Sequence, residues 1–493
     1  MTETAKKKRG MPSSFTILLA LLAIVAVVTV IVSGTSGGAV TAARLSDFCT
    51  APVKGFADAL PVCLFVMILG GFLGMMTETG ALDNGIAVLV QKLKGNEIML
   101  IPVLMLIFSL GGTTYGMCEE TVPFYALLAA TMMAAGFDPM VGAATVLLGA
   151  GCGCLGSTVN PFAVGAAVDA LTGVGIEVNQ SIIIGLGAVL WIVTTVMSIL
   201  FVMSYAKKVK ADKGSTILSM QELKDAEEAH GKAASEVHKE VKLTGRQKGV
   251  LIAFAFTFVV MIVGFIPLAD LNEGVANFFD AGAVYDADGN AIVQGWSALI
   301  TGLPIGQWYF DEASTWFFLM AVLIGIIGGL SEKQIVNTFI TGAADMMSVV
   351  LVIALARGIS VLMASTGLDV YVLDAAANAL SGLSGVIFAP MSFLVYFGLS
   401  FLIPSTSGMA TVSMPIMGPL AVKLGFSPEV MVMIFSAAIG VVNLFTPTSG
   451  AIMGGLALAK VEYSTWLKFG AKLFVVLGVV CIVILTAAMV ILS

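Results

Sequence analysis

Two stretches of this chain, 108–165 and 399–455, carry nearly the same apolar sequence, and Gly, Pro, Ser, Thr and Asn break each of them at two places. Such breaks leave backbone N–H and C=O groups without helical partners. In hydrocarbon these groups are tolerated only where they are buried in protein or line a polar cavity. Four breaks arranged as two matched pairs therefore predict a fold built around a shared polar site inside a membrane.

The composition predicts an all-α polytopic membrane protein in a lipid bilayer. The chain has 493 residues, of which 58% are hydrophobic and 11% are charged, which is more apolar material than a globular core can hide. Several uncharged stretches approach or exceed the roughly 20 residues of a spanning helix. They are 11–43, 59–77, 98–118, 182–206, 249–269, 313–331 and 473–493. The first is too long for a signal peptide and is interpreted as a retained signal-anchor helix.

Other classes of function find little support. The formal charge of -7 includes no single basic patch, so no nucleic-acid partner is expected. Both histidines, His230 and His238, lie in a polar connector, which leaves no histidine for a metal site or an assisted nucleophile in the membrane. Cys152 and Cys154 do not form a CxxC pair. An enzyme and a bound cofactor are therefore not expected; an intramembrane enzyme using Glu119 or a serine is the weakest alternative.

The chain is an internal duplication. Residues 54–80 match residues 341–367 at a constant offset of 287, with five identities. The identical pairs are Gly55 and Gly342, Asp58 and Asp345, Gly71 and Gly358, Thr79 and Thr366, and Gly80 and Gly367. Similar offsets relate Gly116 to Gly408, Gly136 to Gly425 and Pro161 to Pro447.

Lysine and arginine positions predict the orientation, because short cytoplasmic loops carry an excess of positive charge. Basic residues cluster at 6–9, 92–94, 207–248, 333 and 460–472, whereas 267–315 has seven acidic residues and no basic one. Arg44, Lys54 and Lys423 are exceptions. The N-terminus is expected in the cytoplasm and the C-terminus outside. Repeat 1 then begins inside and repeat 2 begins outside, so the two repeats have inverted topology. The expected location is the cytoplasmic membrane of a prokaryote.

The expected domains follow from this plan. They are repeat 1 over 1–206, with a re-entrant hairpin at 98–135 and a broken helix at 140–171; a cytoplasmic connector at 207–248; a linker transmembrane helix at 249–267; an extracytoplasmic insertion at 268–314; and repeat 2 over 315–493, with a hairpin at 386–422 and a broken helix at 430–460. The connector is expected to be a solvated helix or a mobile loop. The insertion is expected to contain a small β-hairpin at 284–293.

The hairpin tips and helix breaks supply the candidate substrate-binding residues. They are Thr113, Thr114, Ser157, Thr158, Asn160, Ser405, Thr406, Ser407, Asn443, Thr446, Thr448 and Ser449. Helix N-termini at such breaks can hold an anionic group. Freed backbone carbonyls can hold Na⁺, and the candidates are those near Gly112, Gly156, Gly408 and Gly450.

Three charged residues lie in otherwise uncharged segments. Glu119 and Glu120 follow the first tip, where a carboxylate costs about 2.5–3.5 kcal/mol on the milder insertion scale. A substrate ammonium, a coupling cation or a proton would compensate, and the alternative is a structural hydrogen bond to neighbouring helix ends. Arg357 is the only charged residue in 346–368. It could clamp a carboxylate or pair with an acid such as Glu78 or Glu119.

Four motifs carry a family resemblance: GGTTYGMCEETVPFY, GSTVNPF, LIPSTSGMATVSMPIMGPLA and NLFTPTSGAIMGGL. They resemble the YfcC-type carriers of the anaerobic C4-dicarboxylate carrier family, within the ion transporter superfamily. The resemblance implies a dimeric inverted-repeat carrier whose hairpin tips and broken helices form the substrate site and move like an elevator. Related sodium–dicarboxylate carriers have Ser-Asn-Thr tips, which this chain lacks, and similar proteins include arginine/ornithine exchangers.

These observations predict a secondary active transporter of a small carboxylate-bearing metabolite, working by exchange or with a coupling Na⁺ or H⁺. The acidic pair favours an amino acid such as arginine or ornithine, with its amine at Glu119 or Glu120. A C4-dicarboxylate carrier is the alternative cargo class. An ion channel is the alternative functional class, because uncapped carbonyls also build selectivity filters.

Overall fold

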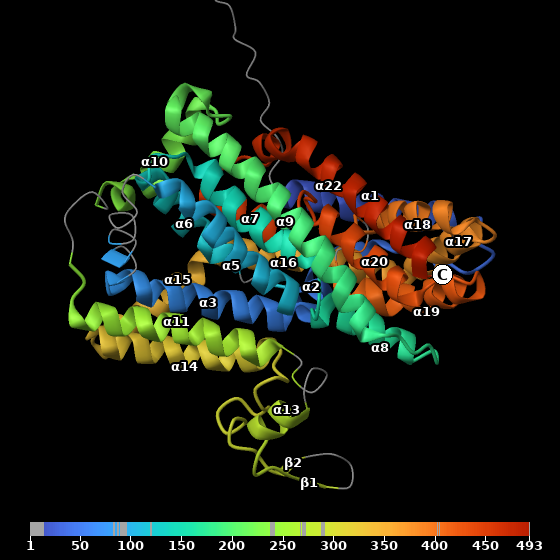
Figure 1. The fold of residues 1–493 in the computed structure, drawn as a ribbon, viewed down its shortest axis with the longest axis horizontal. Helices are drawn as coiled ribbons and strands as arrows, with labels where there is room; N and C mark the ends of the chain where they lie inside the picture. Colours follow the sequence, from blue (N-terminus) through green and yellow to red (C-terminus); the bar gives the residue numbers. More distant parts are fainter. Residues whose placement is uncertain are drawn as a thin grey trace, which may run out of the picture.

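The computed structural model describes residues 14–81, 84, 85, 88, 96–118, 121–236, 242–266, 268, 273–286, 291–401, 403 and 405–492. This part of the chain is almost entirely helical (Figure 1). Eight of its helices are long and apolar enough to cross a membrane. They are α1 (Ser14–Ser33), α3 (Leu60–Glu78), η1 with α5 (Glu97–Met99 and Leu100–Tyr115), α9 (Gln180–Ala211), α11 (Gly245–Phe265), α14 (Phe310–Gly328), α16 (Met347–Thr366) and α22 (Tyr463–Leu492). The expected all-α polytopic class is confirmed.

The duplication is visible in two matched helix pairs. α2 (Leu45–Asp58) continues into α3 through a bend at Ala59, and α15 (Glu332–Asp345) continues into α16 through a bend at Met346, 287 residues later. The pairs exchange partners, because α2 packs on α16 and α15 packs on α3. Glycines permit both crossings: a Cβ at Gly358 would lie 2.8 Å from the Ala51 carbonyl oxygen, and one at Gly70 would lie 2.5 Å from the Gly342 carbonyl oxygen.

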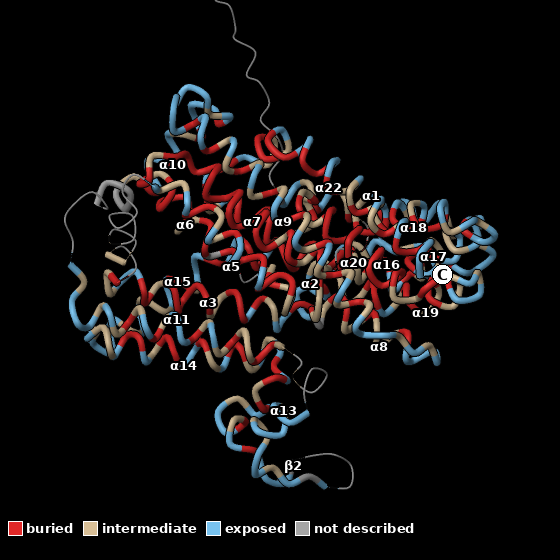
Figure 2. Tube along the Cα trace, viewed as in Figure 1, coloured by how far each residue is buried: buried red, intermediate tan, exposed pale blue. Residues whose placement is uncertain are grey.

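The interrupted segments form two hairpins and two broken helices. The hairpins are α5 with α6 (Val122–Ala134), and α18 (Gly385–Leu399) with α19 (Thr406–Lys423). The broken helices are α7 (Pro139–Leu155) followed by the π-helix η3 (Pro161–Gly165) and α8 (Ala166–Thr172), and α20 (Pro428–Val442) followed by α21 (Gly450–Ala459). α7 and α20 are buried on nearly every side (Figure 2), which their apolar and small residues allow.

Two groups of helices result. The frame consists of α1, α2, α3, α11, α14, α15 and α16, and the hairpin unit consists of α5 to α9 and α18 to α22. In Figure 1, α11 and α14 run side by side with α3 above them, and α5, α7 and α9 run obliquely above α3. α17 (Leu368–Leu380) contacts α16 as well as α18 and α19, and so joins the two groups.

The connector contains a helix, one of the two forms expected, and one face of this helix is docked on the rest of the protein. After the short η4 (Lys213–Ser215), its helix α10 (Met220–Glu236) packs on α6. Glu222 is 3% exposed and accepts a hydrogen bond from the Glu462 backbone N–H (2.9 Å). His230 Nε2 lies 3.1 Å from the Leu458 carbonyl oxygen, and burial lowers the pKa of this imidazole. The sequence pattern did not predict this docking, because the few residues that anchor α10 lie among many polar residues.

The insertion lies beyond the ends of α11 and α14, at the bottom of Figure 1. It contains α13 (Glu273–Phe279) and the antiparallel strands β1 (Val284–Tyr285) and β2 (Ala291–Val293). The β-hairpin expected at 284–293 is therefore confirmed in its strands, while its turn lies outside the described residues.

Candidate functional site

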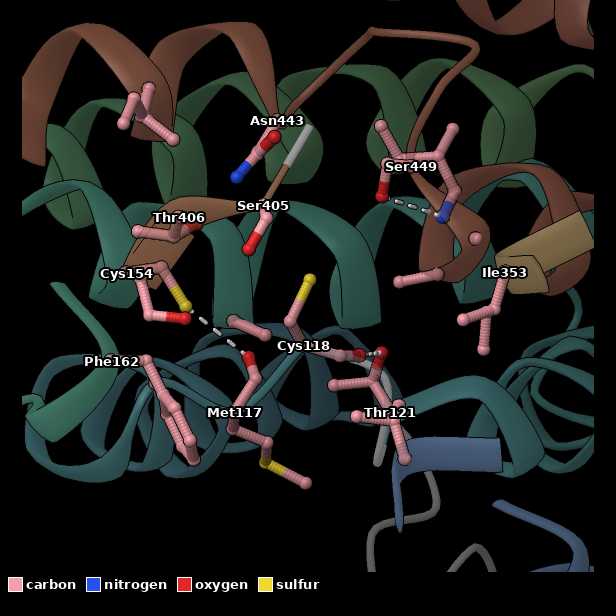
Figure 3. Close-up of a pocket in the computed structure, with 18 of the residues that line it drawn as sticks. Met117, Cys118, Thr121, Cys154, Phe162, Ile353, Ser405, Thr406, Asn443 and Ser449 are labelled. Carbon is pink, nitrogen blue, oxygen red and sulfur yellow. Dashed lines mark hydrogen bonds between the residues drawn. The ribbon is translucent and has the colours of Figure 1, made fainter. Parts of the chain in front are cut away.

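A cavity of about 290 Å³ lies where the interrupted segments meet the frame (Figure 3). All four breaks contribute to its wall. From them come Gly116, Asn160, Ser405, Thr406, Ser407, Asn443, Thr448, Ser449 and Gly450. In the close-up, Ser405, Asn443 and Ser449 lie on one side, facing Met117, Cys118 and Thr121 on the other. Breaks far apart in the sequence are thus brought to one place.

Hydrogen bonds join the tip of the first hairpin, at the end of α5, to the helix break that follows α7. Thr113 Oγ1 donates to the Gly156 carbonyl (2.7 Å), and the Thr158 N–H and hydroxyl both donate to the Thr113 carbonyl (2.9 and 3.0 Å). Gly116 ends α5 with φ +78°, and a Cβ there would lie 2.6 Å from Asn160 Oδ1. Glycine is therefore required at this position by both conformation and space.

Asn160 organises the start of the helix after the first break. Its Oδ1 accepts from the backbone N–H groups of Phe162 (2.9 Å) and Ala163 (3.3 Å), and its Nδ2 donates to Ser157 Oγ (3.0 Å). Ser157 is fully buried and donates to the Cys154 carbonyl (2.6 Å). The amide thus caps N–H groups that would otherwise be unpaired.

In repeat 2 two helices begin at the cavity. Ser405 is the N-cap of α19 and accepts from the Gly408 N–H (3.1 Å), and Ser449 is the N-cap of α21 and accepts from the Ile452 N–H (3.4 Å). Both caps line the cavity, so the partial positive ends of both helices lie at its wall. This arrangement favours a negatively charged group in the cavity.

Residues at the start of α22 form hydrogen bonds with the helix break between α20 and α21. Tyr463 donates its hydroxyl to the Phe445 carbonyl (2.6 Å), and the Trp466 indole N–H donates to the Leu444 carbonyl (2.9 Å). The hydroxyls of Thr446 and Thr448 lie 2.7 Å apart and are buried. Carbonyls released by the break therefore find partners within the protein.

The four glycines whose carbonyls were suggested for Na⁺ differ from one another in their hydrogen bonds and in their position relative to the cavity. The Gly112 carbonyl accepts from the Gly116 N–H (3.1 Å), and the Gly156 carbonyl accepts from Thr113. Gly408 and Gly450 lie in the first turns of α19 and α21, where N–H groups rather than carbonyls lack helical partners. Only Gly450 of the four lines the cavity. A Na⁺ site at these carbonyls stays a prediction.

Arg357 lies near the middle of α16 and pairs with Asp58, at the end of α2. Arg357 Nε is 2.8 Å from Asp58 Oδ2, and the two side chains are 26% and 51% exposed. They are the only charged residues among the described residues that line the cavity. The sequence suggested Glu78 or Glu119 as a partner acid for Arg357, and the structure pairs it with Asp58 instead of Glu78.

Glu119 and Glu120 lie outside the described residues. Cys118 and Thr121, which flank them in the sequence, line the cavity.

Several predicted residues shape the site without lining it. Thr114 donates to the Leu110 carbonyl of its own helix (2.7 Å). The other predicted positions that do not line the cavity are Thr113, Ser157, Thr158, Thr446, Gly112, Gly156 and Gly408. Direct contact of these residues with a ligand in this cavity is not supported. The hydroxyls of Thr113, Ser157 and Thr158 instead form hydrogen bonds that hold the first hairpin and the first helix break in place.

Ser436 is a cavity residue that the sequence pattern did not reveal. Its side chain is 2% exposed, and its hydroxyl has no hydrogen-bond partner among the described residues. It lies on α20 with Gly440, and both share one helical face with Asn443, the C-cap of α20; all three residues line the cavity. The spacing of seven residues before Asn443 is the signal that could have found it. Tyr125, Phe162, Phe310 and Ile353 add apolar wall.

Comparisons with known proteins agree over most of the chain. The model of the family described as C4-dicarboxylate anaerobic carrier (DcuC) matches residues 35–490. An uncharacterized protein of Haemophilus influenzae is 29% identical over 427 residues, covering 86% of this chain and 74% of that protein. The putative basic amino acid antiporter YfcC of Escherichia coli is 28% identical over 444 residues, covering 88% and 78%.

Two solved structures are similar at low identity. MtrF of Neisseria gonorrhoeae, described among antimetabolite efflux pumps, is 17% identical with a TM-score of 0.45, covering 98% of this chain and 96% of its own. The YdaH transporter of Alcanivorax borkumensis is 16% identical with a TM-score of 0.46, covering 97% and 98%.

Proposed function

The chain belongs to the C4-dicarboxylate anaerobic carrier family and is a membrane transporter, and from this premise we propose that it is a secondary active carrier of a small carboxylate-bearing metabolite. It works by exchange or with a coupling Na⁺ or H⁺. The proposed cargo is an amino acid such as arginine or ornithine.

The position of Arg357 carries this proposal. A guanidinium halfway along a membrane-spanning helix is costly unless it is paired or faces a polar cavity, and such residues commonly mark substrate pathways. Arg357 meets both conditions, since it pairs with Asp58 and lines the cavity. Its planar fork of donors matches a carboxylate. The N-termini of α19 and α21 at the same cavity add favourable potential for that carboxylate.

Acidic groups favour a cargo that also carries a positive charge. Asp58 lines the cavity, and Glu119 and Glu120 lie in sequence between two residues that line it. One relative is described as a putative basic amino acid antiporter. The family description instead names C4-dicarboxylates, so a dicarboxylate such as succinate is the second candidate cargo.

An elevator-like movement of the hairpin unit against the frame forms part of the proposal. A separate apolar cluster joins the two groups, with Ala59, Cys63, Val66, Met346, Val349, Val350 and Ile353 from the frame and its helix bends, and Val122 and Ala451 from the hairpin unit. α21 presents glycines to α16: a Cβ at Gly450 would lie 2.5 Å from Ile353 Cγ1, and one at Gly454 would lie 2.7 Å from Val349 Cγ2. The apolar character of this contact supports sliding. The proposed homodimer rests on the family resemblance and is tested by the mass of the solubilised protein.

Counterflow in liposomes tests the proposed function. Purified full-length protein is reconstituted with unlabelled cargo inside, and uptake of labelled arginine, ornithine, aspartate, succinate and fumarate is measured against protein-free liposomes. Saturable counterflow of at least one of these is expected, with Arg357→Gln weakening apparent affinity at least about ten-fold, the effect of losing a charge-assisted hydrogen bond. Absence of counterflow with every carboxylate, or continuous single-channel current, would contradict a carrier of this class.

A further inference from the structure

We propose that Asp58 recognises the cargo's α-ammonium group, so that the Asp58–Arg357 pair opens to bind a zwitterion. In this arrangement the cargo carboxylate replaces Asp58 on Arg357, and its ammonium takes the place of Arg357 on Asp58. The inference rests on the proposed function and narrows its substrate class to α-amino acids.

The geometry of the pair allows such an exchange. The contact between the two residues uses Nε of Arg357 and Oδ2 of Asp58. A guanidinium has five N–H donors and a carboxylate has two acceptor oxygens, so one contact uses only part of either group. The Asp58 side chain is 51% exposed and lines the cavity. A ligand in the cavity can therefore reach both charges.

The duplication indicates that the pair is not needed to form the fold. Asp345 is the counterpart of Asp58 at the offset of 287, and it likewise precedes a bend between two helices. Asp345 is exposed and does not line the cavity. The counterpart of Arg357 is Gly70. The same bend and the same helix exchange therefore form in repeat 2 with no ion pair of this kind.

The chemistry of the opened pair distinguishes between cargoes. Opposite charges that lie 2.8 Å apart are complementary to an α-amino acid, whose carboxylate and ammonium are attached to the same carbon. A cargo without the α-ammonium would release Arg357 from Asp58 and leave that carboxylate without a positive partner. Like charges brought together in this way reduce affinity and so create specificity.

The test compares two pairs of ligands that differ in the α-ammonium: ornithine with 5-aminopentanoate, and aspartate with succinate. Equilibrium binding is measured with purified full-length protein in lipid nanodiscs. Wild type should prefer the amino acid in the pair whose side chain it accepts. Asp58→Asn should lower affinity for that amino acid at least about ten-fold, as expected for a lost charge-assisted contact. Affinity for the matching compound without the ammonium should be unchanged or higher.

Asp345→Asn is the matched control, because it removes the equivalent charge from repeat 2 and should leave both affinities at wild-type values. An equal effect of Asp58→Asn on both members of a pair, or an intact preference in that variant, would overturn the inference while leaving the carrier itself in place. If wild type binds none of the four ligands and also shows no counterflow, the proposed function fails instead.

A folding defect in Asp58→Asn is detected from its thermal midpoint. In that case the inference is tested with Asp58→Glu, which keeps the charge but moves the carboxylate by one methylene. Its ratio of affinities within a ligand pair should change several-fold, and a ratio equal to that of wild type would contradict the inference.

Discussion

Leu155 packs directly on Gly440, so closely that a Cβ added to Gly440 would lie 2.8 Å from Leu155 Cβ. The duplication supplies an equivalent contact, in which Leu444 packs on Gly151. Leu444 lies 289 residues after Leu155, and Gly151 lies 289 residues before Gly440. Both leucines directly precede or enter a helix break. The crossing of α7 and α20 therefore brings the two breaks together beside one cavity.

Gly440→Ala should destabilise the protein, because the added methyl meets the backbone of Leu155, with the Leu155 N only 3.0 Å away. Overpacking of this kind costs about 1–3 kcal/mol. The measurement is the thermal midpoint in detergent. Gly185→Ala in α9 is the control, since nothing lies within 4 Å of its added Cβ, and it should be neutral or gain about 0.5–1 kcal/mol. Equal midpoints for the two variants would show that the close crossing is not limiting.

Ser436→Ala should weaken cargo binding without loss of folding stability, because Ser436 lines the cavity and its buried hydroxyl has no hydrogen-bond partner among the described residues that the substitution would remove. The expected loss of affinity is about two- to ten-fold, the worth of one neutral hydrogen bond. Ser392→Ala is the matched control: Ser392 is also buried and without a partner in the described chain, but it does not line the cavity. Parallel effects of the two substitutions on affinity would argue against the assignment of Ser436.

Ser405→Ala should lower both stability and affinity, because the N-cap of α19 lines the cavity. Loss of an N-cap costs about 0.5–2 kcal/mol. Ser427→Ala removes the N-cap of α20, which lies outside the cavity lining, and should lower the thermal midpoint alone. The pair is compared by thermal midpoint and by equilibrium binding of the cargo found by counterflow. A normal affinity in Ser405→Ala would separate this cap from the binding site.

Docking of α10 should weaken at acidic pH because of His230. Burial lowers the pKa of His230 below its ordinary value near 6.5, so the undocked helix binds more protons than the docked one over the interval between these two pKa values. Docking stability therefore rises with pH through this interval and is lost as pH falls through it. Amide hydrogen exchange of α10, corrected for intrinsic rates, should accelerate as pH falls from about 7.5 to about 5.

His230→Gln is the matched variant, because an amide can still donate to the Leu458 carbonyl but does not titrate. Its exchange rates in α10 should show no such acceleration. An identical pH response in wild type and His230→Gln would assign the effect to other groups at this surface.

Much of the architecture was predictable from patterns in the chain. Apolar runs predicted the spanning helices, and the offset of 287 that relates Asp58 to Asp345 predicted paired repeats. Gly, Pro, Ser and Thr in otherwise apolar segments predicted where helices stop, because helix propensity and capping are local properties. Asn160, Ser405 and Ser449 were found in this way, and all three line the cavity.

The sequence by itself determined the class of protein, the number of repeats and the positions of the four breaks, since hydrophobicity, propensity and repetition are all written along one dimension. Tertiary structure alone decided that Asp58 is the partner of Arg357, that Ser436 lines the cavity with no hydrogen-bond partner in the described part of the chain, and that Thr158 donates hydrogen bonds to Thr113. These relationships depend on how closely helices remote in the chain can approach. That distance is set by packing at glycines such as Gly151 and Gly440, and no local pattern records which surface each glycine will meet.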